Sequence, residues 1–502
     1  MVADNSKRRN KKYGIRHGRF LRYMKCSWAL KTFAFLNPEA MTTDTMDMSE
    51  VDIHQKPLKI QRTPKDLVPV EDLSEIFMES SFGQIDFEKQ YSSAYFIRLE
   101  VLRDSIMQAA RLKWIESGKV KAANLVGHVK SYKGNDGDII LVGVLFKDMS
   151  LKPNVLSDIQ NNLRISDQFM DSRSVGEIAH KLAEKDTLFL EDMEARLQLV
   201  FPDRSVVDSL TTGVVVAVLG AVNTQGFFEV KDFALPGYLQ PDALPVSERE
   251  PAYIGFLSGL RIGSTATNPL ALQMLRDFVM GLSGGVHERE LASKIARIVV
   301  AGDTLFVSAE KDSTGSALAE ADIFLSELAS VVPLDVMSGP RDPVNYCLPQ
   351  QPLHSGLFPE ARRYGNMTVR LNPFKAKVGE MVILGTSGQN VSDVFQYTNA
   401  ESGMDALALI GQSRYLAPTA PDTLACYPFT IKDPLVLSAS NGPVPHLLFA
   451  GNQVQTETKL VANGHLRLAC VADFSVKPSM LLVNINDLSD TRVISFDTPD
   501  SV

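Results

Sequence analysis

The most regular pattern in the chain lies between Asp86 and Glu116, where apolar residues recur every three or four positions. This spacing puts them along one side of a helix, so an amphipathic helix is predicted that must bury its stripe against a neighbouring element. Gly118 supplies the expected stop. The stripe, apolar until its last member, consists of Tyr91, Tyr95, Leu99, Leu102, Ile106, Ala110 and Lys113.

After this helix the pattern changes to that of strands separated by turn residues. The predicted strands occupy 121–132, 138–146, 189–192, 195–201, 212–222 and 227–233, with a polar insertion over about 147–185. Apolar strands, glycine-marked bends and one long insertion are typical of a closed oligonucleotide-binding (OB) barrel. Such barrels often grip single strands with aromatic and basic side chains. These strands are poor in both, which favours a barrel that contacts protein over one that binds DNA.

The second half alternates strands and helices, which predicts an α/β region built as a mixed sheet sandwich with flanking helices. Strands are expected at 253–257, 331–337, 381–385 and 446–451, and helices at 268–281, 317–330 and near 404–417, with a helix leading into a strand over 288–300 and a further apolar segment at 391–395. Beyond Leu460 the pattern is hairpin-like, at 465–473, 480–485 and 491–496. The proline-rich stretch from Pro236 to Pro251 marks a domain boundary.

Three parts are therefore expected: a tail and linker (1–84), the helix with the OB barrel (85–245) and the second domain (251–497). Lys and Arg are frequent in the first 25 residues, where Asp4 is the one acidic residue. This composition indicates a nuclear import signal or a nucleic-acid arm, or otherwise a solvated tail. Residues 37–80 are polar and acidic and are predicted to have little structure. Met41 is a possible alternative start that would make the basic tail dispensable.

The composition excludes several classes of protein. The 502 residues, 45% of them hydrophobic, suffice for two or three domains with buried cores. The net charge of −8 argues against a protein that grips nucleic acid over its whole surface. The four cysteines (Cys26, Cys347, Cys426 and Cys470) form no zinc motif or disulfide framework. The chain has no apolar run of membrane-spanning length, and its N-terminus lacks the apolar core of a signal peptide. An intracellular, soluble protein in a reducing compartment is therefore expected.

Five loops of the second half follow predicted strands or lie between them, where open α/β sheets place their active sites. They are Ser258–Ser264, Ala301–Asp303, Gly339–Asp342, Gly385–Gly388 and Ala450–Val454. Their order and spacing resemble the calcineurin-like metallophosphoesterases, which hold two metal ions on carboxylates, imidazoles and one Asn.

Compared position by position with that family, nearly all the metal ligands are missing. In the first loop Gly259 and Arg261 replace Asp and His, and in the third Pro340 replaces the Asn ligand and Arg341 the catalytic His. In the last two loops Ser387 replaces a His, and Asn452 and Val454 replace two more. Only Asp303 and Asp342 remain. One bridging carboxylate cannot hold two divalent ions, and two arginines would repel them. The resemblance therefore implies an inactive phosphoesterase domain, with no catalytic, cofactor-binding or metal-binding residues.

Two interpretations of the remaining polar residues are open. His354 and Asp342 could form an acid–base pair while Arg261 and Arg341 bind a phosphate oxygen. Alternatively, the residues satisfy one another in a sealed remnant, in which Asp303 or Asp342 pairs with an arginine. The second interpretation is favoured.

The loop after the predicted strand 331–337 continues into a stiff run, Leu348-Pro349-Gln350-Gln351-Pro352-Leu353-His354, whose prolines exclude a helix. An OB barrel placed before a ligand-stripped phosphoesterase domain resembles the small accessory (B-type) subunits of replicative DNA polymerases. The residues from Asp342 to His354, with Phe189-Leu190-Glu191-Asp192, the strand from Thr211 to Gly220 and Phe449-X-Gly451-Asn452-Gln453, resemble the second subunit of DNA polymerase delta. The resemblance covers about 85–497, and the basic N-terminal extension departs from it.

The resemblance implies a nuclear, non-catalytic scaffold for DNA replication and repair. It would bind the cysteine-rich C-terminal domain of the catalytic subunit and a further regulatory subunit, with mostly indirect contact to DNA, no membrane and no cofactor. Two other functions remain open. One is an active metal-dependent phosphoesterase or exonuclease that uses Asp303 and Asp342, and the other is a single-strand DNA binder acting through the barrel.

Overall fold

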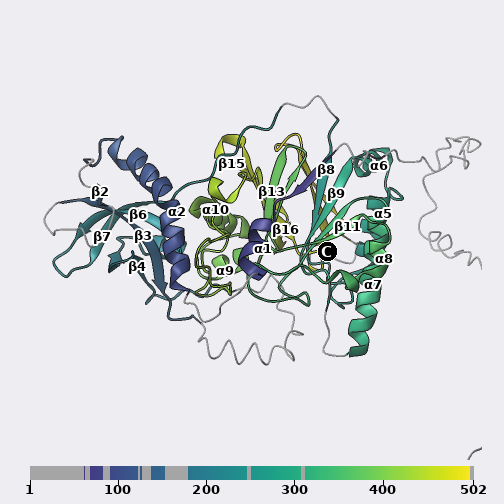
Figure 1. The fold of residues 1–502 in the computed structure, drawn as a ribbon, viewed down its shortest axis with the longest axis horizontal. Coiled ribbons are helices and arrows are strands. Elements are labelled where there is room, and N and C mark those ends of the chain that lie inside the picture. The colour runs from purple at the N-terminus through teal and green to yellow at the C-terminus, as the bar shows by residue number, and fades with distance from the viewer. Residues whose placement is uncertain are drawn as a thin grey trace, which may run out of the picture. The chain divides into compact units, whose positions relative to one another are not determined.

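A computed structural model describes residues 62, 68–82, 91–121, 125–126, 137–152, 179–245, 250–306 and 311–497 (Figure 1). The basic tail, most of the polar insertion and most of the predicted strand 121–132 lie outside these residues. Among the helices that are described, none is both long and apolar enough to cross a membrane.

The first half contains a sheet that closes on itself. Its strands follow the order β2-β3-β4-β5-β7-β6, and pairing of β3 with β6 completes the closure. Alternate residues of the strands, such as Leu141, Leu188 and Phe228, fill the interior. This is the arrangement of the predicted OB barrel. Its elements are β2 (Leu125–Val126), β3 (Ile139–Asp148), β4 (Thr187–Glu191), β5 (Arg196–Val200), α4 (Arg204–Ser209), β6 (Val215–Val222) and β7 (Phe228–Ala234).

The predicted amphipathic helix is present as α2 (Ser92–Ala110), extended by one π-helical turn, η2 (Arg111–Ile115). It packs on β3 and β6, and Gly118 adopts the left-handed conformation just beyond it. The predicted stripe is wrong at its two ends: Tyr91 is exposed, and Lys113 reaches Asp232 at the surface. Arg98 and Trp114 are instead fully buried, because the helix contacts a second surface that its own periodicity does not reveal.

The second half is built on two six-stranded mixed sheets. The first has the order β1-β12-β13-β14-β16-β15 and the second the order β11-β10-β9-β8-β17-β18. The strands of the first are β1 (Val70–Asp72), β12 (Phe374–Val378), β13 (Met381–Thr386), β14 (Leu447–Gln453), β16 (Leu466–Ala472) and β15 (Glu457–Val461). Those of the second are β11 (Met367–Arg370), β10 (Leu334–Met337), β9 (Ile295–Ala301), β8 (Tyr253–Leu257), β17 (Ser479–Asn484) and β18 (Thr491–Ser495).

The sheets pack face to face over an apolar core, in which the rings of Phe256 and Phe449 lie 4.9 Å apart. Helices cover the outer face of each sheet, so the predicted sandwich with flanking helices is confirmed. The helices are α5 (Pro269–Met280), α6 (Val286–Ser293), α7 (Lys311–Ala329), α8 (Pro359–Arg362), α9 (Gln389–Gln396) and α10 (Gly403–Ser413), with the short turns η6 (Ser355–Leu357), η7 (Ala439–Asn441) and η8 (Ala462–Gly464).

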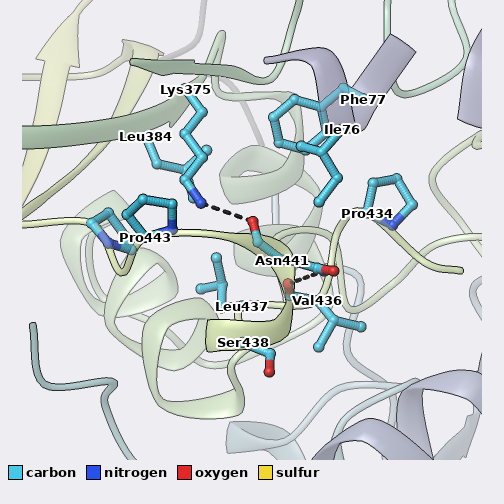
Figure 2. Close-up of a pocket in the computed structure, with 11 residues that line it drawn as sticks. Ile76, Phe77, Lys375, Leu384, Pro434, Val436, Leu437, Ser438, Asn441 and Pro443 are labelled. Carbon is cyan, nitrogen blue, oxygen red and sulfur yellow. Dashed lines mark hydrogen bonds between the residues drawn. The ribbon is translucent and has the colours of Figure 1, made fainter. Parts of the chain in front are cut away.

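Part of the predicted linker is folded, in contrast to the expectation of little structure over 37–80. Within residues 68–82, here called the N-terminal strap, β1 pairs antiparallel with β12 and is followed by α1 (Glu75–Phe82). The Ser74 hydroxyl donates to the Lys375 carbonyl and accepts from the Lys375 N–H, both at 3.0 Å. Phe77, 2% exposed, belongs to the apolar core and forms part of the wall of the pocket shown in Figure 2. The strap therefore belongs to the two-sheet sandwich, although the barrel follows it in the chain.

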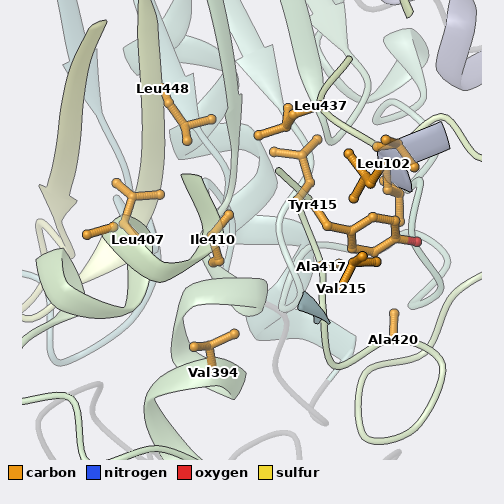
Figure 3. Packing of buried hydrophobic residues seen from close by; sticks show 14 of the residues in the cluster. Leu102, Val215, Val394, Leu407, Ile410, Tyr415, Ala417, Ala420, Leu437 and Leu448 are labelled. Carbon is orange, nitrogen blue, oxygen red and sulfur yellow. The ribbon is translucent and has the colours of Figure 1, made fainter. Parts of the chain in front are cut away.

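A single apolar core joins the barrel to the sandwich. It combines side chains from α2 and the barrel, such as Leu102 and Val215, with others from the helices and loops of the sandwich, such as Val394, Ile410 and Leu437 (Figure 3). Because the two halves share buried side chains, they pack as parts of one unit.

Candidate functional site

The five loops singled out in the sequence meet at one edge of the sandwich. Strands β8, β9 and β10 run parallel, as do β13 and β14, so their carboxyl ends lie together. The Gly259 N–H donates to the Gly302 carbonyl at 3.0 Å, and the Asn452 side chain donates to the Ser387 carbonyl at 2.8 Å. A Cβ on Gly302 would lie within 2.8 Å of Gly339, so the approach of these loops requires glycine.

Asp303 is fully buried and pairs with Arg341. Its Oδ2 accepts from Arg341 Nη1 and its Oδ1 from the Arg341 backbone N–H, each at 2.9 Å. The expectation that a surviving carboxylate pairs with an arginine is therefore confirmed for Asp303. The guanidinium lies on the carboxylate that would bridge two metal ions in the resembled family.

Arg261 forms a second buried ion pair, with Asp473 at the end of β16. Burial raises the pKa of Asp473, and the Arg261 charge acts against that shift. Burial likewise lowers the pKa of Arg261. Sequence reasoning missed Asp473, because it assigned the segment 465–473 to a strand. The available signal was an acidic residue directly after an apolar strand that ends beside the other loops.

Asp342 holds the loop backbones together. Its carboxylate accepts the backbone N–H groups of Asp303 at 2.9 Å, Leu305 at 3.0 Å and Gly339 at 2.8 Å. Burial and the neighbouring Asp303 carboxylate raise the pKa of Asp342 to about 8, while the three N–H donors act in the opposite direction. These donors lie in two loops of the site or, for Leu305, two residues beyond one of them, so Asp342 stabilises the loop arrangement.

His354 takes no part in this cluster. It is exposed, and its Nδ1 accepts the Gly356 N–H at 3.2 Å as the cap of a short 3-10 turn. Asp342 is 5% exposed and bonded to the three backbone donors named above. The predicted alternative, an acid–base pair of His354 with Asp342, is wrong in this structure.

Uncharged side chains fill the position where Ser387 replaces a histidine. The Asn372 amide donates to Ser387 Oγ at 2.8 Å and to Gln350 Oε1 at 2.6 Å, and Ser387 Oγ donates to Gln389 at 2.6 Å. Gln350 also donates to the Asn345 carbonyl at 2.9 Å, which connects the stiff run 348–354 to the network. These amides and hydroxyls satisfy one another and offer no imidazole to a metal.

Three residues of these loops have a strained backbone. Arg261, Asp303 and Asn452 have φ values of 40°, 54° and 54°, in the left-handed region that few non-glycine residues occupy. Such strain persists only where surrounding contacts impose it and is common at functional sites.

Within the described ranges, no group of three or more His, Cys, Asp or Glu side chains could hold a metal ion. The residues present do not fit the two-metal chemistry of the resembled phosphoesterases.

Comparison with known proteins assigns the two halves. Residues 90–233 match the family model of the DNA polymerase delta subunit OB-fold domain, and residues 254–459 match that of the B subunit of DNA polymerase alpha/epsilon. The DNA polymerase delta small subunit of Arabidopsis thaliana is 34% identical over 455 residues, which cover 87% of this chain and 97% of the relative. The chain belongs to the DNA polymerase delta small subunits.

Other similarities extend this assignment. DNA polymerase delta subunit 2 of Drosophila melanogaster is 30% identical over 450 residues, covering 85% of this chain and 97% of the relative. A solved archaeal phosphodiesterase overlaps 48% of this chain and 99% of its own, with 10% identity and a TM-score of 0.27, too low to support a conclusion. As a DNA polymerase delta small subunit, the protein is an accessory subunit of the polymerase complex and acts in DNA replication.

Proposed function

We propose that this protein is a nuclear, non-catalytic scaffold that joins the catalytic subunit of DNA polymerase delta to a further regulatory subunit in replication and repair. The Arg341–Asp303 ion pair carries the non-catalytic part of the proposal. A guanidinium bound to the surviving carboxylate supplies fixed positive charge where the resembled enzymes hold metal ions. A divalent ion would have to displace it and would then face Arg261 as well.

The junction between the two halves supports the scaffold part. The Lys147 ammonium on β3 donates to the carbonyls of Leu210 in the barrel and Tyr397 in the sandwich, both at 2.9 Å. The Asn399 N–H of the sandwich donates to the Asp208 carbonyl of the barrel, also at 2.9 Å. Contacts of this kind, with the fully buried Lys147 among them, favour a fixed geometry between the two halves. Partners bound to their outer faces would then be held at defined positions. On this proposal residues 85–245 and 251–497 form one rigid unit.

Reconstitution tests the scaffold proposal. This chain, the catalytic subunit and the further regulatory subunit of the same organism are expressed in pairs and together, and assembly is followed by size-exclusion chromatography with light scattering. We expect each of the other subunits to bind this chain. We expect those two subunits to elute together only when this chain is present. A catalytic subunit that binds the regulatory subunit equally well without this chain would refute the bridging role.

A separate assay tests the absence of catalysis. The purified chain is incubated with Mn²⁺ and either bis-p-nitrophenyl phosphate or a 3′-labelled oligonucleotide. We expect no turnover above the level of the Asp303→Ala variant. Turnover by the wild-type chain that this substitution abolishes would support the alternative, an active phosphoesterase.

A further inference from the structure

A buried lysine that the proposed function does not use lines the pocket between α1 and the loop before β14 (Figure 2). Lys375 on β12 is 5% exposed, and its Nζ donates to the Asn441 carbonyl at 3.0 Å. Most of the other lining residues are apolar, among them Ile76 from α1, Leu437 and Pro443. The amine therefore lies in surroundings that solvate a positive charge poorly.

Within the described residues, no carboxylate pairs with this amine. The Asn441 carbonyl is the one acceptor there that its N–H groups reach. The charged group that acts on Lys375 is another cation, the exposed Lys432. Burial, together with that neighbouring cation, lowers the pKa of Lys375 to about 8. An amine in an apolar pocket beside a second cation keeps a sizeable neutral fraction near neutral pH, and the neutral form is the nucleophile.

Gly442 leaves the amine accessible to a small reagent. This glycine is exposed, and a Cβ built on it would lie 3.5 Å from Lys375 Nζ. The amine thus lies close beneath a residue that has no side chain to cover it. The neighbouring Asn441 side chain donates to the carbonyls of Asp433 and Val436 at 3.1 and 2.8 Å, which holds the loop in place over the amine.

The pocket suits an acylated lysine better than an ammonium group. An ammonium has three N–H donors for the single acceptor found among the described residues, whereas an acylated lysine has one N–H, which that acceptor satisfies. Acylation also removes the buried charge. The interior has room for about one water-sized group, which is close to the size of a methyl group. An acetyl group therefore fits, and longer acyl groups do not.

We propose that Lys375 is an acetyl-acceptor site that reacts with a short-chain acyl thioester. The neutral amine attacks the thioester carbonyl, the N–C bond forms as the C–S bond breaks, and the displaced thiolate takes up the amine proton. The amide N–H of the product donates to the Asn441 carbonyl, and its methyl group lies beside Ile76 and Leu437. Because Ile76 belongs to α1, the acetyl group packs between the N-terminal strap and the loop 434–445. This inference does not depend on the scaffold function.

Acetylation kinetics on the full-length chain test the proposal. The folded chain is incubated with acetyl coenzyme A at about pH 7.5, the remaining amines are then labelled with isotopically heavy acetic anhydride, and mass spectrometry measures the occupancy of each lysine. Lys377 is the matched control, because it lies two positions further along β12 and pairs with Glu380 at 2.9 Å. We expect Lys375 to be acetylated about 10-fold faster than Lys377 in the folded chain.

Two conditions connect this difference to the folded pocket. In concentrated urea, where both lysines lose their surroundings, the two rates should become nearly equal. In the folded chain, the rate at Lys375 should rise with pH up to about pH 8 and level off above it, since the amine is then largely neutral. A rate at Lys375 in the folded chain equal to or below that of Lys377 would overturn the proposal.

A chain that carries acetyl-lysine at position 375, introduced during translation by codon reassignment, tests whether the pocket accepts the product. Its melting temperature should equal or exceed that of the wild-type chain, because the modification removes a buried charge and keeps the hydrogen bond to Asn441. Lys375→Gln, which carries an uncharged amide, should likewise melt no lower than wild type. An acetylated chain that melts several degrees lower, or does not fold, would show that the pocket excludes the acetyl group and would refute the proposal.

Discussion

The Arg98 guanidinium of α2 lies over the ring of Tyr415, 3.5 Å from its centroid, at the junction between the barrel and the sandwich. It also donates to the carbonyl of Gly213 at 2.7 Å, next to the barrel strand β6, and to that of Ala420 at 2.9 Å, in the sandwich. The Tyr415 hydroxyl donates to the buried Asp433 carboxylate at 2.5 Å. One fully buried cation thus connects the helix, the barrel and the sandwich.

Replacing Arg98 should therefore destabilise the protein strongly. Arg98→Met leaves buried carbonyls without donors and Asp433 without its nearby cation, a loss of about 3–5 kcal/mol. Arg98→Lys should recover little, because an ammonium cannot reproduce the planar fork. The measurement is the urea midpoint by circular dichroism. Arg111→Met, at an exposed arginine just beyond the end of α2, is the control and should shift the free energy of unfolding by less than about 0.5 kcal/mol. Equal midpoints for the variants at Arg98 and Arg111 would contradict the role of the junction.

The Arg341–Asp303 pair predicts a strong energetic coupling between its members. Arg341→Met leaves a fully buried carboxylate without its cation and should cost about 1–3 kcal/mol, since Arg341 itself is one-third exposed. Asp303→Asn suits the left-handed backbone at φ 54° and removes the charge. The double variant should be more stable than the sum of the two single losses implies. A double-mutant cycle that finds no coupling would show that the pair does not stabilise the loops.

His446 predicts a loss of stability in mild acid. Its Nδ1 accepts the Val382 N–H at 3.0 Å, and its Nε2 lies 3.0 Å from the Asp242 carbonyl, so only the neutral ring with its proton on Nε2 satisfies both. Burial lowers the pKa of His446 below the ordinary 6.5, with Asp242 raising it and His465 and Lys377 lowering it. Because the unfolded chain then binds the proton more readily, stability is fully present above about pH 6.5 and falls as the pH drops below it.

Thermal unfolding at a series of pH values tests whether stability falls as the pH drops. Between pH 7.5 and 5.0, the melting temperature of the wild-type chain should fall further than that of His446→Gln, which cannot titrate. His287→Gln, at an exposed position on α6, should keep the wild-type pH dependence. If the melting temperature of His446→Gln falls with pH as steeply as that of the wild-type chain, another group causes the acid sensitivity.

The N-terminal strap predicts that substitutions at two adjacent residues differ sharply in the stability that they remove. Phe77→Ala leaves a cavity in the apolar core that Phe77 shares with Leu384 and Leu437 and should cost about 3–5 kcal/mol. Met78→Ala, at a residue that is 49% exposed, should cost less than about 0.5 kcal/mol. Similar denaturant midpoints for Phe77→Ala and Met78→Ala would indicate that the strap contributes no stability.

Local patterns in the sequence predicted most of the elements, because their causes are local. The apolar run in 138–146 corresponds to β3, and Asn268 and Gly281 cap α5 at the predicted ends. The strap escaped prediction because β1 is three residues long and its pairing partner lies about 300 positions away. The burial of Arg98 was equally invisible, since its acceptor on Pro418 is 320 positions away and a charge on a helix ordinarily indicates solvent.

The candidate site was predicted as a set of loops and not as a set of contacts. The order of the glycines and carboxylates indicated which loops would meet, and charge alone indicated that Asp303 or Asp342 would pair with an arginine. That Arg341 provides this partner, while Arg261 pairs with Asp473, depends on side-chain directions that only the assembled sheets determine. Asn372 was missed as well, because nothing in its surroundings marks a buried amide before β12 is known.

The strap also constrains the order of events during synthesis. Ser74 leaves the ribosome early, but its bonding partner Lys375 lies 301 residues further along the chain. At about 5–20 residues per second, the strap waits roughly 15–60 s before the strand that it completes exists. During that interval the whole barrel is made, and the apolar Ile76 and Phe77 cannot yet pack against Leu384 and Leu437. The nascent chain thus carries an apolar segment whose binding partners do not yet exist, for most of its synthesis.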